Sequence, residues 1–148
     1  MANALRHLAA IRSRLLSSPA LTAIVARTPA PDSLPAIYLG HIFEVPEAEV
    51  VYPCITLSQP DGNRAVWAPK LWDAARIQID FFSKNNQFEP ATMAELAEDL
   101  LHTDKTRTST AEACFHEIRE LFSNTSSWDG DTNAWRQTVI YLVRVSTH

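Results

Sequence analysis

The run DGDTN at residues 129–133 is the stretch of this chain that most suggests chemistry, because its oxygen-bearing side chains could hold a cation. Oxygen ligands at the first, third and fifth positions are those with which a calcium-binding loop begins. The pattern then fails. Ala134 stands where such a loop needs a glycine, and Ile140 stands where it needs a bidentate glutamate. We therefore interpret 129–133 as an ordinary turn.

A soft-metal site could be built from Cys114, His116 and His102. However, Cys114 and His116 fall in a predicted helix, where residues two apart point to different faces. Zinc also takes about four ligands, commonly in close pairs, and the sequence has no CxxC or HxxxH pair. We predict a buried thiol beside a surface histidine, with no metal and no cofactor.

Catalytic signatures are missing as well. A nucleophilic triad is usually recognised by local context, and no GxSxG run surrounds any serine. The three glycines, Gly40, Gly62 and Gly130, lie far apart, so neither a GxGxxG nor a Walker-type phosphate loop is present. We predict no catalytic residue and no enzyme activity, and keep a small α+β enzyme or ligand-binding module as an alternative.

Four tryptophans are more informative than these polar runs. Trp67 and Trp72 lie in a polar stretch bounded by prolines, and Trp128 lies in a Ser/Asp/Gly-rich loop. Each indole either packs back on its own domain or docks on a partner, since aromatic anchors are enriched at protein interfaces. Trp67, Trp72 and Trp128 are therefore candidate interface residues.

Three arginines in the first predicted helix form the second candidate set. Arg6, Arg12 and Arg14 interrupt its apolar positions and should face water or a partner. Such charges are either a solvated helix face or contacts to acids or phosphates of another molecule. We include them among the candidate interface residues.

Length and composition limit the class of protein. The chain has 148 residues, 46% of them hydrophobic and 20% charged, which suits a single globular domain. A formal net charge of -4 argues against a nucleic-acid binder with a broad basic surface. No apolar run reaches the roughly 20 residues that span a bilayer, so we expect no membrane partner. The two cysteines fit a reducing cytosol better than a disulfide framework.

Periodicity predicts the elements. Ser18-Pro19 is a helix-start signal, and Ile77, Ile79 and Phe81 alternate with polar residues as in a strand with one buried face. Residues 36–51 are ambiguous, and 64–72 form either a long hairpin arm or an exposed loop. The predicted helices are Asn3–Ser17, Pro19–Arg27, Pro90–Leu101 and Thr110–Phe122, and the predicted strands are Cys54–Ser58, Ala74–Ser83 and Trp135–Thr147.

This order predicts a single α+β domain over 1–148, with an extended arm over 50–72. Strands and helices segregate without βαβ alternation, which favours a mainly antiparallel or mixed sheet flanked by helices. The last strand is apolar on both faces at its centre. It is therefore either central in the sheet and covered on both sides, or covered by a neighbouring subunit.

The whole pattern resembles the tail terminator (tail completion) proteins of long-tailed bacteriophages. The resemblance rests on five stretches in order: LRHLAAIRSRLLSSPALTAIV, YPCITLSQPDG, RIQIDFFS, EPATMAELAEDLLH and WRQTVIYLVRV. In that family, strands of the forms YPxITxS and xxQIDxxS, an alanine- and leucine-rich helix and a closing strand recur in this order. The resemblance spans nearly the full chain.

The resemblance implies a virion structural role. Family members form a ring, usually of six subunits, that caps the tail tube at the top of the tail and joins it to neck or head-completion proteins. They carry no catalytic residues, and no motif fixes a binding residue that could be carried over. We therefore expect a protein made in the host cytoplasm whose partners are itself, the tube protein and a neck protein. DNA would pass through the ring unbound, which the acidic balance suits. The alternative in the same class is another neck component, a head-completion or stopper protein.

Overall fold

The computed structural model describes residues 2–46, 49–59, 73–101, 108–109 and 113–147. Trp67, Trp72 and the part of the predicted arm from residue 60 to residue 72 lie outside the described residues.

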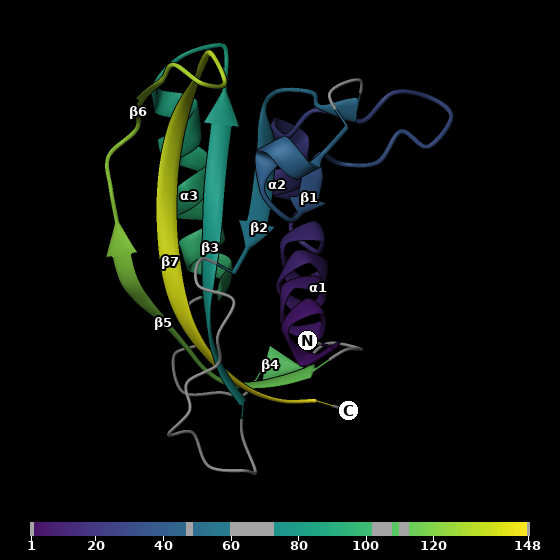
Figure 1. Cartoon of the computed structure of the whole chain (residues 1–148), viewed down its shortest axis with the longest axis vertical. Coiled ribbons are helices and arrows are strands. Elements are labelled where there is room, and N and C mark those ends of the chain that lie inside the picture. Colours follow the sequence, from purple (N-terminus) through teal and green to yellow (C-terminus); the bar gives the residue numbers. More distant parts are fainter. Residues whose placement is uncertain (1, 47–48, 60–72, 102–107, 110–112, 148) are drawn as a thin grey trace.

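One mixed sheet organises the described part of the chain (Figure 1). Its strands are β1 (Ile37–Leu39), β2 (Cys54–Ser58), β3 (Asp73–Ser83), β4 (Thr108–Ser109), β5 (Ala113–Ser123), β6 (Ser127–Asp129) and β7 (Ala134–Thr147). The order is β1-β2-β3-β7-β5-β4, and β6 pairs with β7 beyond the end of β5. The β1–β2 pair is parallel and the other pairs are antiparallel. The predicted α+β class with a mixed sheet is confirmed.

Three α-helices accompany the sheet: α1 (Ala2–Leu16), α2 (Pro19–Ile24) and α3 (Phe88–Leu101). The start of α2 is set by Ser18, whose Oγ accepts a hydrogen bond from the Leu21 N–H at 3.2 Å. Asn86 caps α3 in the same way, because its Oδ1 accepts from the N–H groups of Phe88 and Glu89 at 2.9 Å each. No helix among the described residues is both long enough and apolar enough to cross a membrane.

The main core lies between the helices and one face of the sheet, here called the helix-covered face. Figure 1 shows α3 behind β3 and β7. The strands contribute alternate residues to this face, and α1, α2 and α3 contribute their apolar sides. Its buried members include Ile11, Leu15, Leu21, Ile55, Leu57, Ile77, Ile79, Phe81, Met93, Ala97, Val139, Tyr141 and Val143.

A smaller core lies on the opposite face of the sheet at one end. Phe82, Cys54 and Ala134 are fully buried there beneath the segment that connects β1 to β2. That segment, ambiguous in sequence, contains a 3₁₀ turn at Ile42–Glu44, and Ile42 from the turn completes the small core. The rest of this face carries no helix among the described elements, and we call it the open face.

The prediction of a helix over Thr110–Phe122 is wrong, because its described part, from Ala113 onward, lies in strand β5. It pairs with β7 from Ala113 to Ser123, with register shifts between Phe115 and Glu117 and between Glu120 and Phe122. Each such bulge inserts a residue that breaks the strict alternation of a strand. The disturbed alternation imitates a helical period, so the pattern was misread. The argument that Cys114 and His116 point apart on a helix therefore does not apply.

Two smaller differences concern the end of the second helix and the stretch before the last strand. The second helix ends at Ile24 instead of Arg27, because Ala26 turns to pair with other segments. The Ala26 N–H donates to the Pro53 carbonyl and its carbonyl accepts from the Ala36 N–H, both at 2.8 Å. The polar stretch before the last strand contains the short strand β6. The predicted strands over 54–58, 74–83 and 135–147 are confirmed.

Candidate functional site: the open face of the sheet

The open face is arranged in rows, which the strand register defines across β3, β7 and β5. Residues paired across neighbouring strands share a face, and every second residue returns to it. One row is Arg76–Leu142–Arg119, and the next is Gln78–Ile140–Phe122. Asp80–Thr138 and Phe82–Arg136 follow along the strands. The face thus runs from arginines, through an apolar row, to a polar cluster.

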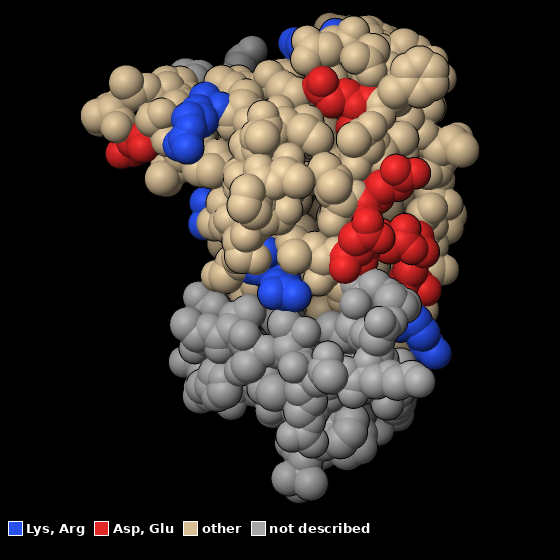
Figure 2. Space-filling model, turned by 180° about the vertical axis from the view of Figure 1, so that it is seen from behind, with Lys and Arg blue, Asp and Glu red and all other residues tan. Residues whose placement is uncertain are grey.

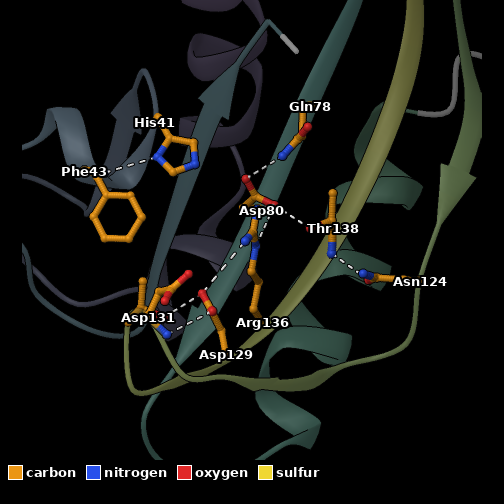
Figure 3. Close-up of polar contacts among 10 residues, drawn as sticks. His41, Phe43, Gln78, Asp80, Asn124, Asp129, Asp131, Arg136 and Thr138 are labelled. Atoms are coloured by element: carbon orange, nitrogen blue, oxygen red, sulfur yellow. Dashed lines mark hydrogen bonds and ion pairs between the residues drawn. The ribbon is translucent and has the colours of Figure 1, made fainter.

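The polar cluster is centred on Asp80, whose side chain is only 2% exposed. Its Oδ1 accepts hydrogen bonds from the Arg136 Nε at 3.1 Å and from the Thr138 hydroxyl (Figure 3). Its Oδ2 accepts from the Gln78 amide at 3.0 Å. A buried carboxylate is stable only with such partners, so the cluster fixes β3 to β7 at this point.

Arg136 extends the cluster toward the turn before β7. Its Nη1 lies 3.8 Å from the Asp129 Oδ2, and its guanidinium lies 5.6 Å from the Phe82 ring centroid. Asp129 also accepts hydrogen bonds from the Asp131 N–H at 3.2 Å and the Thr132 hydroxyl at 2.9 Å. These contacts are those of an Asx-type turn, as predicted for 129–133. The part of the chain that the structure describes contains no cluster of three or more metal-ligating side chains.

Asn124 lies in the gap between β5 and β6, and it continues the hydrogen bonding to β7 there. Its N–H donates to the Thr138 carbonyl at 3.1 Å, and its Oδ1 accepts from the Thr138 N–H at 2.8 Å (Figure 3). The side chain therefore replaces a backbone carbonyl that the ladder lacks here. Phe122 and Trp128 flank the gap, 51% and 53% exposed, and with the polar cluster they line an open groove of about 420 Å³.

Exposed aromatic rings around a buried polar cluster favour binding over catalysis. Burial raises the pKa of the Cys54 thiol far above its usual range, so this cysteine stays protonated and unreactive. A larger hollow of about 830 Å³, beside the small core, is lined by Phe43, Tyr52 and Lys84 among others. No histidine or cysteine is among its lining residues.

The predicted interface residues fall into different settings. Arg12 does not point into water, since its Nε donates to the Ile37 carbonyl at 2.7 Å and fixes α1 to β1. Arg14 is half-buried at the end of α1. Arg6 lies on α1, and nothing of its side chain is described. Trp128 is half-exposed on β6, with its ring 5.4 Å from that of Trp135 in a T-shaped pair. The structure does not bring these residues together, and their interface role stays a prediction.

Sequence reasoning missed the residues that organise the open face, above all Asp80, Arg136 and Phe122. Asp80 occupies a polar position in the alternation of β3, where solvent exposure was the simple interpretation. A buried charge is recognised only from its partner, which here is 56 residues away along the chain. Phe122 was assigned to the apolar side of a helix. The available signal was the mixed apolar and polar composition of both faces of β7.

Comparisons with known proteins find the fold but no sequence family. No protein-family model matches the chain, and no curated protein matches its sequence. Among solved structures, the chain is similar to a chain of the "Virion of native gene transfer agent (GTA) particle". The TM-score is 0.64 at 17% identity, and the similarity covers 98% of this chain and 96% of that one. The two chains therefore share one fold over essentially their full lengths.

Proposed function

We propose that this chain is a virion structural protein of the phage type, and specifically a tail terminator subunit. Its ring would cap the tail tube and join it to the neck. The observation that carries the proposal is the full-length fold shared with a chain of a gene transfer agent virion. The family resemblance of the five sequence stretches supports the specific role, because it was found independently of the fold.

The open face gives the proposal a physical basis. A mainly antiparallel sheet can leave one face to water when that face is polar, so exposed apolar residues on such a face favour a binding partner there. Here Phe122 is 51% exposed on that face, beside Ile140. A ring subunit needs surfaces that fit the next copy, and an uncovered sheet face can serve as one of them. We propose no enzyme activity and no cofactor.

The proposed partners follow from this role. They are further copies of the chain, closing into a ring of six, then the tube protein on one side of the ring and a neck or head-completion protein on the other. DNA would pass through the channel without specific binding, because an acidic lining repels phosphate. The second candidate is another neck component, which the shared virion fold supports equally well.

Electron microscopy of the full chain, alone and mixed with uncapped tail tubes, tests the proposal. We expect rings, either free or seated on the tube ends. Binding to the portal side with no binding to tubes would favour the neck component instead. A protein that stays a monomer with tubes and with portal complexes, and that binds a small molecule in the 830 Å³ hollow, would overturn both. A channel lined by lysine and arginine would contradict the passive passage of DNA.

A further inference from the structure

The open face, which no described helix covers, combines apolar residues with basic residues beside them. Arg76 and Arg119 flank Leu142 in one row, and Ile140 and Phe122 lie in the next. Strands lie about 4.8 Å apart, so the two arginine positions are separated by roughly 10 Å across the sheet. Arg76 and Arg119 are both exposed residues. An occupant of this face should therefore offer an apolar group together with carboxylates.

Helix α3, on the opposite side of the molecule, presents an apolar group together with carboxylates. The buried residues of this helix are Pro90, Met93, Ala94, Ala97 and Leu101. Its outer side is the stripe Phe88–Thr92–Glu95–Asp99, which follows the helical period and is exposed throughout. Phe88 is 73% exposed, more than any other large hydrophobic residue described. The helix contains acidic residues and no basic one, and the view from behind shows acidic atoms gathered over this region (Figure 2).

We propose that the outer stripe of α3 in one subunit packs on the open face of the next copy around the ring. The carboxylates of Glu95 and Asp99 would meet the row that contains Arg119, and Phe88 would lie toward Phe122 and the groove. This inference rests on the proposed ring. It deepens that proposal by naming the two surfaces that meet.

Geometry favours a second copy as the occupant. The stripe and the open face lie on opposite sides of one subunit, with α3 and the sheet between them (Figure 1). A contact between two different surfaces is heterologous, and it forms a closed ring when the rotation between neighbouring copies divides a full turn. Each open face would gain a helical layer, so that helices would cover both sides of the sheet. The opposite charges of the two surfaces would guide this pairing and disfavour contacts between like surfaces.

Disulfide trapping tests the contact directly. In the full chain with Thr92→Cys and Phe122→Cys, oxidation should produce a ladder of linked subunits that stops at the ring number. Thr92→Cys alone and Phe122→Cys alone control for the native cysteines. Thr92→Cys with Ala23→Cys is the matched control, because Ala23 is exposed on α2 and away from the open face. A ladder no stronger than in these controls overturns the contact.

Charge exchange provides a second measurement. Arg119→Glu or Glu95→Arg alone should raise the concentration needed for assembly by about tenfold, because each places like charges together. The two changes in one chain should restore assembly, which a merely structural effect would not do. Glu44→Arg makes the same charge change on the exposed 3₁₀ turn and should have no effect. Additive losses in the double variant would contradict the pairing.

The same experiments separate the two proposals. Rings visible by microscopy without the Thr92–Phe122 link would leave the ring proposal standing and overturn this contact. A linked ladder without a closed particle would support the contact and overturn the ring. If neither rings nor links form, alone or with tubes, both proposals fail.

Discussion

The helix-covered face and the open face of the sheet are formed by the same strands but bury different kinds of side chain. The first buries mainly apolar side chains of β3 and β7, such as Phe81 and Val143, against helices. The second buries one carboxylate, Asp80, and leaves Phe122 half-exposed on β5. Packing stabilises the first face, whereas the second combines a fixed polar cluster with surface left for a partner. The proposed assembly would therefore use the face on which folding depends less.

The largest expected effect comes from comparing two phenylalanines. Phe81→Ala removes a fully buried ring from the helix-covered face and should lower the free energy of unfolding by about 3–5 kcal/mol. Phe122→Ala removes a half-exposed ring from the open face and should lower it by about 0.5 kcal/mol or less. Urea denaturation of both variants measures the difference. Equal losses would mean that the open face is part of the core.

The polar cluster gives the next largest effect. Asp80→Ala leaves Arg136, Thr138 and Gln78 without their shared acceptor, and should cost about 2–3 kcal/mol of unfolding free energy. Asp129→Asn is the control, because its 3.8 Å ion pair with Arg136 is partly exposed and should contribute about 1 kcal/mol or less. If both variants were equally stable in a denaturation experiment, the buried carboxylate would not hold β3 to β7.

A smaller effect tests helix α2, which belongs to the helical layer on the helix-covered face. Ser18→Ala removes the cap of α2 and should lower the free energy of unfolding by about 1 kcal/mol. Ser17→Ala is the matched control, since its hydroxyl only donates to the Arg14 carbonyl at an exposed position. Thermal unfolding followed by circular dichroism measures both. A larger loss at Ser17 would show that the cap is not what starts α2.

At alkaline pH, ionisation of tyrosine in the unfolded chain should lower the stability of the fold, an effect that is absent at neutral pH. One tyrosine from each core tests it. Burial, with smaller effects of nearby acidic groups, raises the pKa of Tyr52 beside the small core to about 12 and raises that of Tyr141 in the main core still further. Unfolded tyrosine loses its proton near pH 10. The folded state keeps that proton longer, so this contribution to stability is complete below pH 10 and decreases as the pH rises toward 12.

Denaturation at pH 9 and pH 11 measures this effect. We expect the loss of stability at pH 11 to be reduced to a similar extent in Tyr141→Phe and in Tyr52→Phe, because the folded-state pKa of both tyrosines lies above pH 11. Tyr38→Phe is a further comparison, since burial also raises the pKa of Tyr38. An undiminished loss of stability at pH 11 in both Tyr141→Phe and Tyr52→Phe would contradict the raised pKa values.

The helix-covered face could largely be predicted from sequence, because its signals are local. Ile77, Ile79 and Phe81 alternate without interruption, and Ser18-Pro19 marks a helix start within two residues. The open face could not be predicted, since it depends on pairings between distant segments. β5 reads as a helix because two bulges disturb its alternation, and only its pairing with β7 shows that it is a strand.

The candidate site was predictable only in part for the same reason. Trp128 was named from its residue type, and it does line the groove. Asp80 and Arg136 are separated by 56 positions, so their ion pair has no local signature. Arg12 was expected to face water or a partner, yet its Nε donates to the Ile37 carbonyl because α1 lies beside β1. Charge type alone does not show whether an arginine faces a partner or its own backbone.

The central place of β7 affects when the subunit can fold. β7 pairs with β3 on one side and with β5 and β6 on the other, so β3 and β5 belong to one sheet only once β7 lies between them. During synthesis, β3 emerges more than fifty residues before β7, and one edge of β3 stays unpaired in the meantime. Unpaired apolar strands invite aggregation. We therefore expect a nascent chain stalled before Ala134 to need chaperones, and the addition of β7 to complete the sheet in one cooperative step.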